Sequence, residues 1–275
     1  MEKIKYSEVK NFIDGKFTSN GQARMDVLSP IDGKVISKVL LSKKNDLDAA
    51  VESAKKAFPA WSATPIKERV QIFYRYRNLM EKHMDELSYI THLENGKTID
   101  EARAEVEKSI ELTEFACSLP QLIGGEILEV SKGVECRIDH APLGVVASIA
   151  PFNFPHMVPH WTIPNALALG NCMIMKPSEQ VPITSSYIAD MLKEAGLPDG
   201  VFNVVNGDKD IVEAICDHPG IAAVSYVGST KVAKIVYIRS TGTLKRCVSK
   251  SFAPAKNEPP KSVNCEFGIS PSGVS

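Results

Sequence analysis

What this chain lacks excludes several classes of protein. Its 275 residues contain no apolar run of about 18, the length a membrane-spanning helix needs. Lys and Arg number 32 against 33 Asp and Glu, so no excess positive charge is present to attract nucleic acid. The N-terminal residues have no apolar signal core, and acidic residues enter early, which disfavours a transit peptide. We therefore expect a cytoplasmic protein with no membrane or nucleic-acid partner.

The six cysteines form no Cys-x-x-Cys pair and no close cluster with histidine. This spacing predicts neither a zinc site nor another metal site, and the chain is too sparse in cysteine for a disulfide scaffold. We expect reduced thiols. Hydrophobic residues make up 44% and charged residues 24% of the chain, which is typical of a globular protein with a sizeable core.

Residues 1–117 begin with short β segments between turns and continue as helices. One apolar face is spaced by 4, 3, 4 and 3 residues; it consists of Leu47, Val51, Ala54, Phe58 and Trp61. Thr64 followed by Pro65 predicts the start of a second helix, whose apolar stripe runs over 66–90 and ends at Asn95–Gly96. Thr98 and Glu101 form a capping box that predicts a third helix.

Two later segments differ in pattern from these helices. Residues 118–140 alternate apolar and polar side chains around glycines, which predicts a β-hairpin or extended arm able to join a neighbour. Residues 141–245 alternate apolar strands with helices, and the strand at Val145–Ala150 is apolar on both faces. This order predicts an α/β fold with a doubly wound parallel sheet, whose ligand crevice lies at the carboxyl ends of the strands. Residues 246–275 are rich in Pro, Ser and Lys, and we expect a disordered tail there.

Three predicted strand ends carry polar groups suited to chemistry. Asn153 lies in a proline-bounded turn and could donate to an oxyanion, or it could bond a local carbonyl. Lys176 and Glu179 suit paired ribose hydroxyls, or they form an exposed salt bridge at a helix start. Ser229 follows Gly228 before a helix, where it could donate to phosphate or act as an ordinary N-cap.

The order of these motifs on consecutive strand–helix units resembles the N-terminal part of the aldehyde dehydrogenase superfamily, from about residue 8 to about residue 246. The details are most similar to the CoA-acylating methylmalonate-semialdehyde and malonate-semialdehyde dehydrogenases. The segments that carry the resemblance are Leu93–Lys97, Pro142–Val145, Pro151–Pro155, Met157–Pro159, Trp161, Met175–Glu179, Ala195–Gly200, Asn203–Gly207 and Val227–Thr230.

The resemblance implies a Rossmann-like NAD-binding domain with an oligomerisation arm. The backbone near Ala150 and Phe152 would border the nicotinamide ribose and the diphosphate. Lys176 and Glu179 would hold the adenosine ribose, with Gln180 nearby where relatives often carry a basic residue. Ser229 would meet the diphosphate, and Asn153 would donate to the oxyanion.

The family reaction, as the resemblance implies it, starts when a cysteine thiolate attacks a semialdehyde. Hydride then passes to NAD⁺, and CoA takes the acyl group. None of the six cysteines fits the nucleophile motif, so we expect a truncated chain that carries the NAD-binding half without turnover. The alternatives are an NAD-binding or oligomerisation module, or an inactive remnant. Homo-oligomers are expected from the family.

Overall fold

The computed structural model describes residues 5–19 and 23–251. Its centre is a seven-stranded sheet in the order β11-β10-β7-β8-β9-β1-β2. Five strands run parallel: β7 (Val145–Ile149), β8 (Cys172–Lys176), β9 (Phe202–Val204), β10 (Ala223–Gly228) and β11 (Arg246–Ser251). Two short strands, β1 (Asn11–Ile13) and β2 (Lys16–Thr18), extend the sheet in antiparallel fashion. The predicted doubly wound α/β fold is confirmed.

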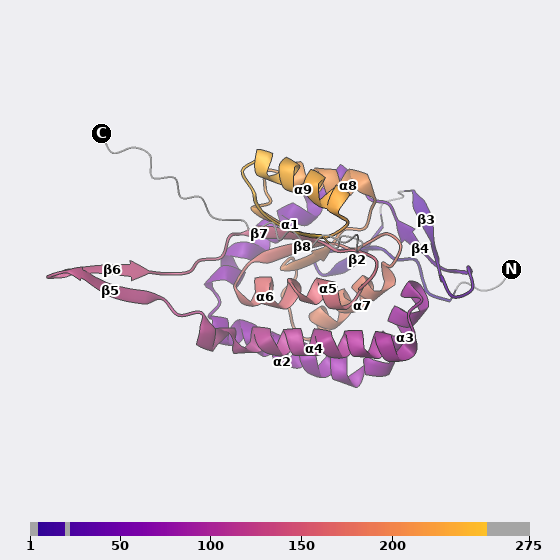
Figure 1. Ribbon diagram of the computed structural model, residues 1–275, viewed down its shortest axis with the longest axis horizontal. Coiled ribbons are helices and arrows are strands. Elements are labelled where there is room, and N and C mark those ends of the chain that lie inside the picture. The colour runs from indigo at the N-terminus through magenta and orange to yellow at the C-terminus, as the bar shows by residue number, and fades with distance from the viewer. Residues whose placement is uncertain (1–4, 20–22, 252–275) are drawn as a thin grey trace, which may run out of the picture.

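Helices cover both faces of this sheet (Figure 1). One face packs against α1 (Lys44–Ala63), α8 (Lys209–Asp217) and α9 (Thr230–Gly242). The other carries α5 (Met157–His160), α6 (Ile163–Ala168) and α7 (Ile183–Glu194), with α2 (Ile66–Lys82), α3 (Met84–Asn95) and α4 (Ile99–Leu122) outside them. Strands β7 and β8 are therefore buried along their whole length, as their apolar sequences predicted.

Two hairpins stand beside the main sheet. Strands β3 (Arg24–Leu28) and β4 (Val35–Leu40) pair with each other and bury a small separate cluster against α3 and α7. Strands β5 (Glu126–Ser131) and β6 (Val134–Ile138) form the predicted arm, which projects away from the body (Figure 1). Every residue of these two strands is exposed.

The expected boundary at residue 246 was wrong, because Arg246–Ser251 form β11 and pair with β10. Their polar composition hid a strand that forms through pairing with an existing sheet edge. The rest of the expected tail, 252–275, lies outside the described residues.

Two helix predictions also need correction. Pro65, not Thr64, occupies the N-cap of α2. The stripe over 66–90 spans two helices that meet at His83, because α2 and α3 both pack on α4. An apolar stripe can continue across such a break without a change in its spacing. Within residues 5–19 and 23–251, no helix combines the length and apolarity needed to cross a bilayer.

Candidate functional site

The carboxyl ends of β7, β8 and β10 lie side by side in the sheet. Ile149 pairs with Lys176 on one side and with Tyr226 on the other. Beyond the end of β7, the Ala150 N–H donates to the Lys176 carbonyl at 3.1 Å. Since neighbouring strands are about 4.8 Å apart, the loops that follow these three strands meet at one edge. Tertiary structure thus brings together the segments that hold the three predicted sets of side chains.

The strand order reverses between β7 and β10. From β7 the chain builds outward through β8 and β9, then returns to add β10 and β11 on the other side of β7. In open parallel sheets, ligands bind in the crevice at this reversal, outside the carboxyl ends of the strands. The loop after β7, with Ala150 and Phe152, and the turn after β10, with Ser229, follow the two strands between which the order reverses.

Lys176 and Glu179 form an ion pair at 2.8 Å. The sequence left open an exposed salt bridge at a helix start. The pair is not fully exposed, because the Lys176 side chain is only 5% exposed and that of Glu179 30%. Ser178, between them, accepts from the Gln180 N–H at 3.3 Å. Gln180 itself is exposed. The Lys176 ammonium and the Glu179 carboxylate thus place one hydrogen-bond donor group and one acceptor group at the carboxyl end of β8.

Ser229 is the N-cap of α9, and its Oγ accepts from the Val232 N–H at 3.4 Å. It is exposed, and it begins a 13-residue helix whose first turn carries the positive end of the helix dipole. A Cβ on Gly228 would lie 2.2 Å from the Tyr226 hydroxyl, so glycine lets the turn close over that ring. Ser229 is therefore an N-cap, as the alternative held. The Tyr226 side chain also hydrogen-bonds Ser229, so only part of the first turn remains open to an anion.

The loop after β7 presents Asn153 between two prolines, Pro151 and Pro155. The Asn153 amide oxygen is buried, and it has no hydrogen-bond partner within the described part of the chain. Its side chain is thus not used to tie the loop together. Phe152 is 54% exposed, whereas Ala150 is buried against the sheet.

Three side chains that sequence reasoning did not single out hold this loop. Asn95 Nδ2 donates to the Phe152 carbonyl at 2.7 Å, and Lys97 Nζ donates to the Asn153 carbonyl at 3.1 Å. Glu105 accepts from two further loop amides. Asn95 and Lys97 lie in the Leu93–Lys97 segment, one of the segments that carried the family resemblance, and this membership was the only sequence signal for their role. Nothing in the pattern of α4 distinguished Glu105 from a solvated helix residue.

Glu94, the neighbour of Asn95, caps helix α7 from inside the protein. Its carboxylate accepts from the Ile183 N–H at 2.8 Å and the Thr184 N–H at 3.0 Å, and also from the Thr184 hydroxyl. Burial raises the pKa of Glu94 to about 7, against the opposing effect of these three donors. The carboxylate therefore couples α3 to the segment that follows Gln180.

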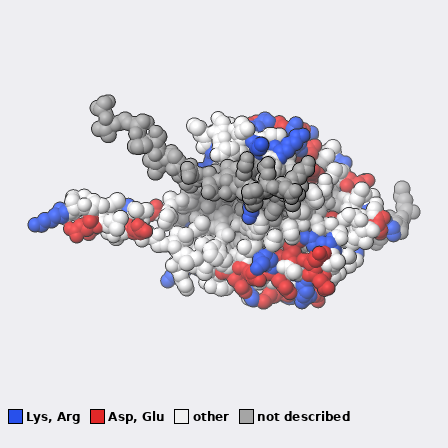
Figure 2. All heavy atoms as spheres, in the orientation of Figure 1, with Lys and Arg blue, Asp and Glu red and all other residues white. Residues whose placement is uncertain are grey.

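Two hollows lie on either side of this loop. One, of about 510 Å³, is lined by Phe152 and Gln180 together with Asn95. The other, of about 380 Å³, is lined by Phe154 and Lys97 among others. Figure 2 shows mainly acidic side chains, with a few basic ones among them, over α3 and α4.

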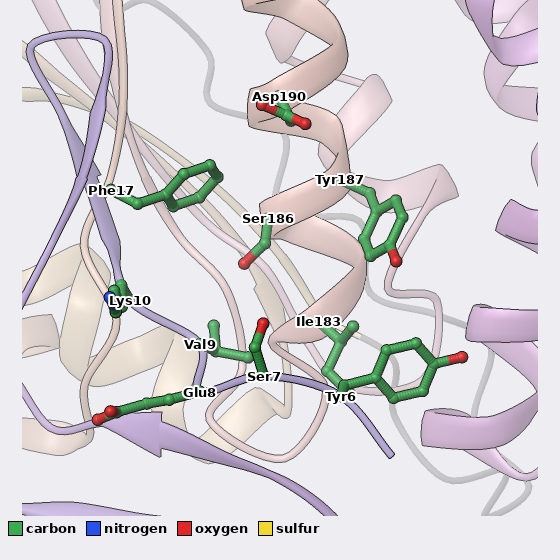
Figure 3. A pocket seen from close by; sticks show the side chains of 10 residues that line it. All are labelled: Tyr6, Ser7, Glu8, Val9, Lys10, Phe17, Ile183, Ser186, Tyr187 and Asp190. Atoms are coloured by element: carbon green, nitrogen blue, oxygen red, sulfur yellow. The ribbon is translucent and has the colours of Figure 1, made fainter.

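A third hollow, of about 520 Å³, lies between the N-terminal segment and α7 (Figure 3). Phe17 on β2 reaches toward α7, which contributes Ser186 and Asp190. No residue predicted for the site lines it, and it lies apart from the strand ends. Its size alone does not make it the cofactor crevice.

Cys117, Cys136, Cys172 and Cys216 are free thiols. Burial raises the pKa of Cys117 to about 11 and of Cys172 to about 12, and it also raises the pKa of Cys216. Because the thiolate is the nucleophilic form, burial disfavours the reactive form of all three. The described residues contain no group of three or more His, Cys, Asp or Glu side chains placed to hold a metal ion.

Comparison with known proteins supplies a context for this geometry. The model of the aldehyde dehydrogenase family matches residues 17–251. The chain is 43% identical over 256 residues to malonate-semialdehyde dehydrogenase 1 of Shouchella clausii. The matched region covers 92% of this chain and 52% of that protein. The chain is 45% identical over 251 residues to the malonate-semialdehyde dehydrogenase of Lacticaseibacillus casei, covering 90% and 51%. The chain thus spans about half the length of the curated relatives it matches.

Solved structures agree with the sequence comparison. The methylmalonate-semialdehyde dehydrogenase of Oceanimonas doudoroffii superposes with a TM-score of 0.86 at 39% identity, over 88% of this chain and 50% of that one. A chain from Sinorhizobium meliloti, solved as a complex with NAD, superposes with a TM-score of 0.85 at 41% identity, over 87% and 49%.

Proposed function

The chain belongs to the aldehyde dehydrogenase family, and from that premise we propose that it binds NAD⁺ as the dinucleotide half of a semialdehyde dehydrogenase. The observation that carries this is the sheet order, which places the loops after β7 and β10 on either side of the reversal point. Residues 1–117 and 141–251 would form one NAD-binding domain, because both contribute strands to the same sheet.

The residues present fit a dinucleotide. Lys176 and Glu179 would bind the two hydroxyls of the adenosine ribose, with Gln180 beside them. The N-terminus of α9 with Ser229 would hold the diphosphate, since the start of a helix attracts an anion. The backbone from the buried Ala150 to the exposed Phe152 would border the nicotinamide ribose.

The proposed reaction is oxidation of malonate or methylmalonate semialdehyde to an acyl-CoA, with CoA as co-substrate. When bound, NAD⁺ supplies the hydride acceptor. This chain's contribution would be Asn153, whose side-chain amide would donate to the oxygen that becomes negatively charged as the aldehyde carbon is attacked. No hydrogen bond from the Asn153 Nδ2 to another described residue competes with this role, and the amide oxygen also has no partner among the described residues.

A nucleophilic thiolate at the strand ends is the remaining requirement. The described cysteines do not meet it: Cys117, Cys172 and Cys216 are buried with raised pKa values, Cys136 lies on the β5–β6 arm, and Cys247 lies near the amino end of β11. We therefore propose that the 275-residue chain binds NAD⁺ and does not turn over substrate. We also propose a cytoplasmic location, which the free thiols of Cys117, Cys136, Cys172 and Cys216 support.

A second role, assembly with another copy of this chain, is favoured by the β5–β6 arm. An isolated two-stranded hairpin is marginally stable in water, yet this one is extended and exposed on both faces, with Ile127 64% and Val130 60% exposed. Sedimentation velocity of the chain would test it. We expect an oligomer that Ile127→Lys dissociates, and a monomer at all concentrations would contradict it.

Isothermal titration with NAD⁺ tests the cofactor proposal. We expect saturable binding, weakened about tenfold or more by Lys176→Met, which removes a charged partner of the ribose. Lys44→Met is the matched control, because Lys44 forms an exposed ion pair with Asp48 on α1. Absence of binding by the folded wild-type chain would refute the proposal. NADH formation from a semialdehyde and CoA would refute the expected lack of turnover.

The same sample distinguishes a folded module from an inactive remnant. A cooperative thermal transition of a monodisperse sample, shifted upward by NAD⁺, is the result expected of a binding module. A chain that aggregates without a transition would favour the remnant.

A further inference from the structure

Resting on the proposed function, we infer that Lys97, Glu105 and Asn95 are positioning residues that fix the Asn153 loop in the orientation its chemistry requires. These three side chains come from the end of α3, the turn after it and the first half of α4. They are separated from the loop by about 50 residues or more of sequence, yet they contact almost every residue of it.

The contacts run along the loop in order. Asn95 Nδ2 holds the Phe152 carbonyl at 2.7 Å, and Lys97 Nζ holds the Asn153 carbonyl at 3.1 Å. The Lys97 ammonium also lies 4.4 Å from the centre of the Phe154 ring, within the range of a cation–π contact. Pro155, which has no N–H to donate, separates the Lys97 contacts at Asn153 and Phe154 from the Glu105 contact at His156.

Glu105 holds the other end of the loop. Its Oε1 accepts from the His156 N–H at 2.8 Å and from the Met157 N–H at 3.0 Å. Its Oε2 accepts from Lys97 Nζ. The two charges are therefore one unit: the cation binds the carbonyl of Asn153, and the carboxylate binds the amides that open α5.

Burial makes this unit rigid. The Lys97 side chain is 11% exposed and that of Glu105 is 1% exposed. A buried charge that loses its partner is strongly disfavoured, so neither side chain has an alternative arrangement in which the loop is free. The network continues to His156, whose Nδ1 lies 2.7 Å from the Ser109 hydroxyl on α4. Asn153 itself keeps its amide oxygen unpartnered, because its neighbours rather than its own side chain anchor the loop.

This arrangement separates the two halves of the proposed cofactor site. The loop borders the nicotinamide half, whereas Lys176 and Glu179 would serve the adenosine half. Loss of the Lys97 ammonium should therefore weaken binding of NAD⁺ and leave binding of AMP, which reaches only the adenosine half, unchanged. A merely structural role in stability would lower both affinities or neither.

The test uses the full 275-residue chain and two probes, NAD⁺ and AMP, in isothermal titration. For Lys97→Met and Glu105→Gln we expect NAD⁺ affinity to fall about tenfold and AMP affinity to stay within about twofold. Lys97→Arg, which keeps the charge, should restore part of the loss. Lys44→Met is the control for removal of a paired surface lysine. A ¹⁵N spectrum with labelled asparagine should show the Asn153 side-chain amide shifted in Lys97→Met and unshifted in the control.

Each outcome decides the inference. Unchanged NAD⁺ affinity with an unshifted Asn153 amide would overturn it, as would equal losses for NAD⁺ and AMP. If Lys97→Met fails to fold, Asn95→Ala gives the answer, because it removes only the amide that holds Phe152. If the wild-type chain binds neither probe, the proposed function fails, and the Asn153 amide signal alone decides the positioning role.

Discussion

Replacing Glu94 with Gln removes a buried carboxylate from beneath helix α7, and the expected effect is a change in how stability depends on pH. In the folded chain burial raises the pKa of Glu94 from 4.5 to about 7. The unfolded chain keeps the ordinary value. Between these two pH values the folded state binds more protons than the unfolded state, so the stability provided by protonated Glu94 falls as pH rises.

The magnitude follows from the size of the rise. Each pKa unit is worth about 1.4 kcal/mol, so ionising Glu94 in its buried position costs about 3 kcal/mol between pH 4.5 and pH 7. The carboxylate is fully buried, so no solvent screening reduces this value. Three donors from Ile183 and Thr184 still hold the ionised group, which is why the pKa is not higher.

Urea unfolding of wild-type and Glu94→Gln chains, measured at intervals from pH 4.5 to pH 8, provides the assay. Gln resembles the protonated carboxyl, so the two free energies of unfolding should run together near pH 4.5. At pH 8 the variant should have gained about 3 kcal/mol relative to wild type. Taking the difference cancels the titration of all other groups. Parallel curves over the whole range would refute the reasoning, since they would mean that Glu94 is ionised in both states.

Three further predictions concern stability. Arg69→Met should lower the free energy of unfolding by about 3 kcal/mol or more in urea titration, because the buried guanidinium donates to carbonyls at the ends of α1 and α6; a loss below about 1 kcal/mol would contradict this. Burial lowers the pKa of His160 to about 4, so wild-type stability should be lost as pH falls from 6.5 toward 4, and His160→Gln should reduce that loss; an unchanged acid profile would show that the histidine is not buried neutral. Thr98→Ala removes the capping box with Glu101 and should destabilise the chain by about 1 kcal/mol, whereas Thr98→Ser should not.

Much of the local structure was predictable because local signals determine it. The capping box at Thr98 begins α4, and Gly96 ends α3 in the left-handed conformation. The apolar run at Val145–Ile149 forms a strand buried on both faces. The strand ends with Asn153, Lys176 and Ser229 also followed from the motifs, since glycine, proline and capping residues mark where such turns occur.

Long-range contacts decided the rest. Strand β11 forms because its backbone pairs with the edge of β10, which its polar sequence does not indicate. The reversal of strand order between β7 and β10, which defines the crevice, has no signal in either strand.

The sequence by itself determined most of the long helices, most of the strands, the family resemblance and the polar residues at the strand ends, because spacing and capping act within a few residues. It did not reveal the break between α2 and α3 or the short helices α5 and α6. Only the tertiary structure decided which of these lie together and what supports them. The contacts from Lys97 and Glu105 to the Asn153 loop join residues about 50 apart. Hydrogen bonds between such distant segments depend on how helices pack, and packing leaves no periodic pattern along the chain.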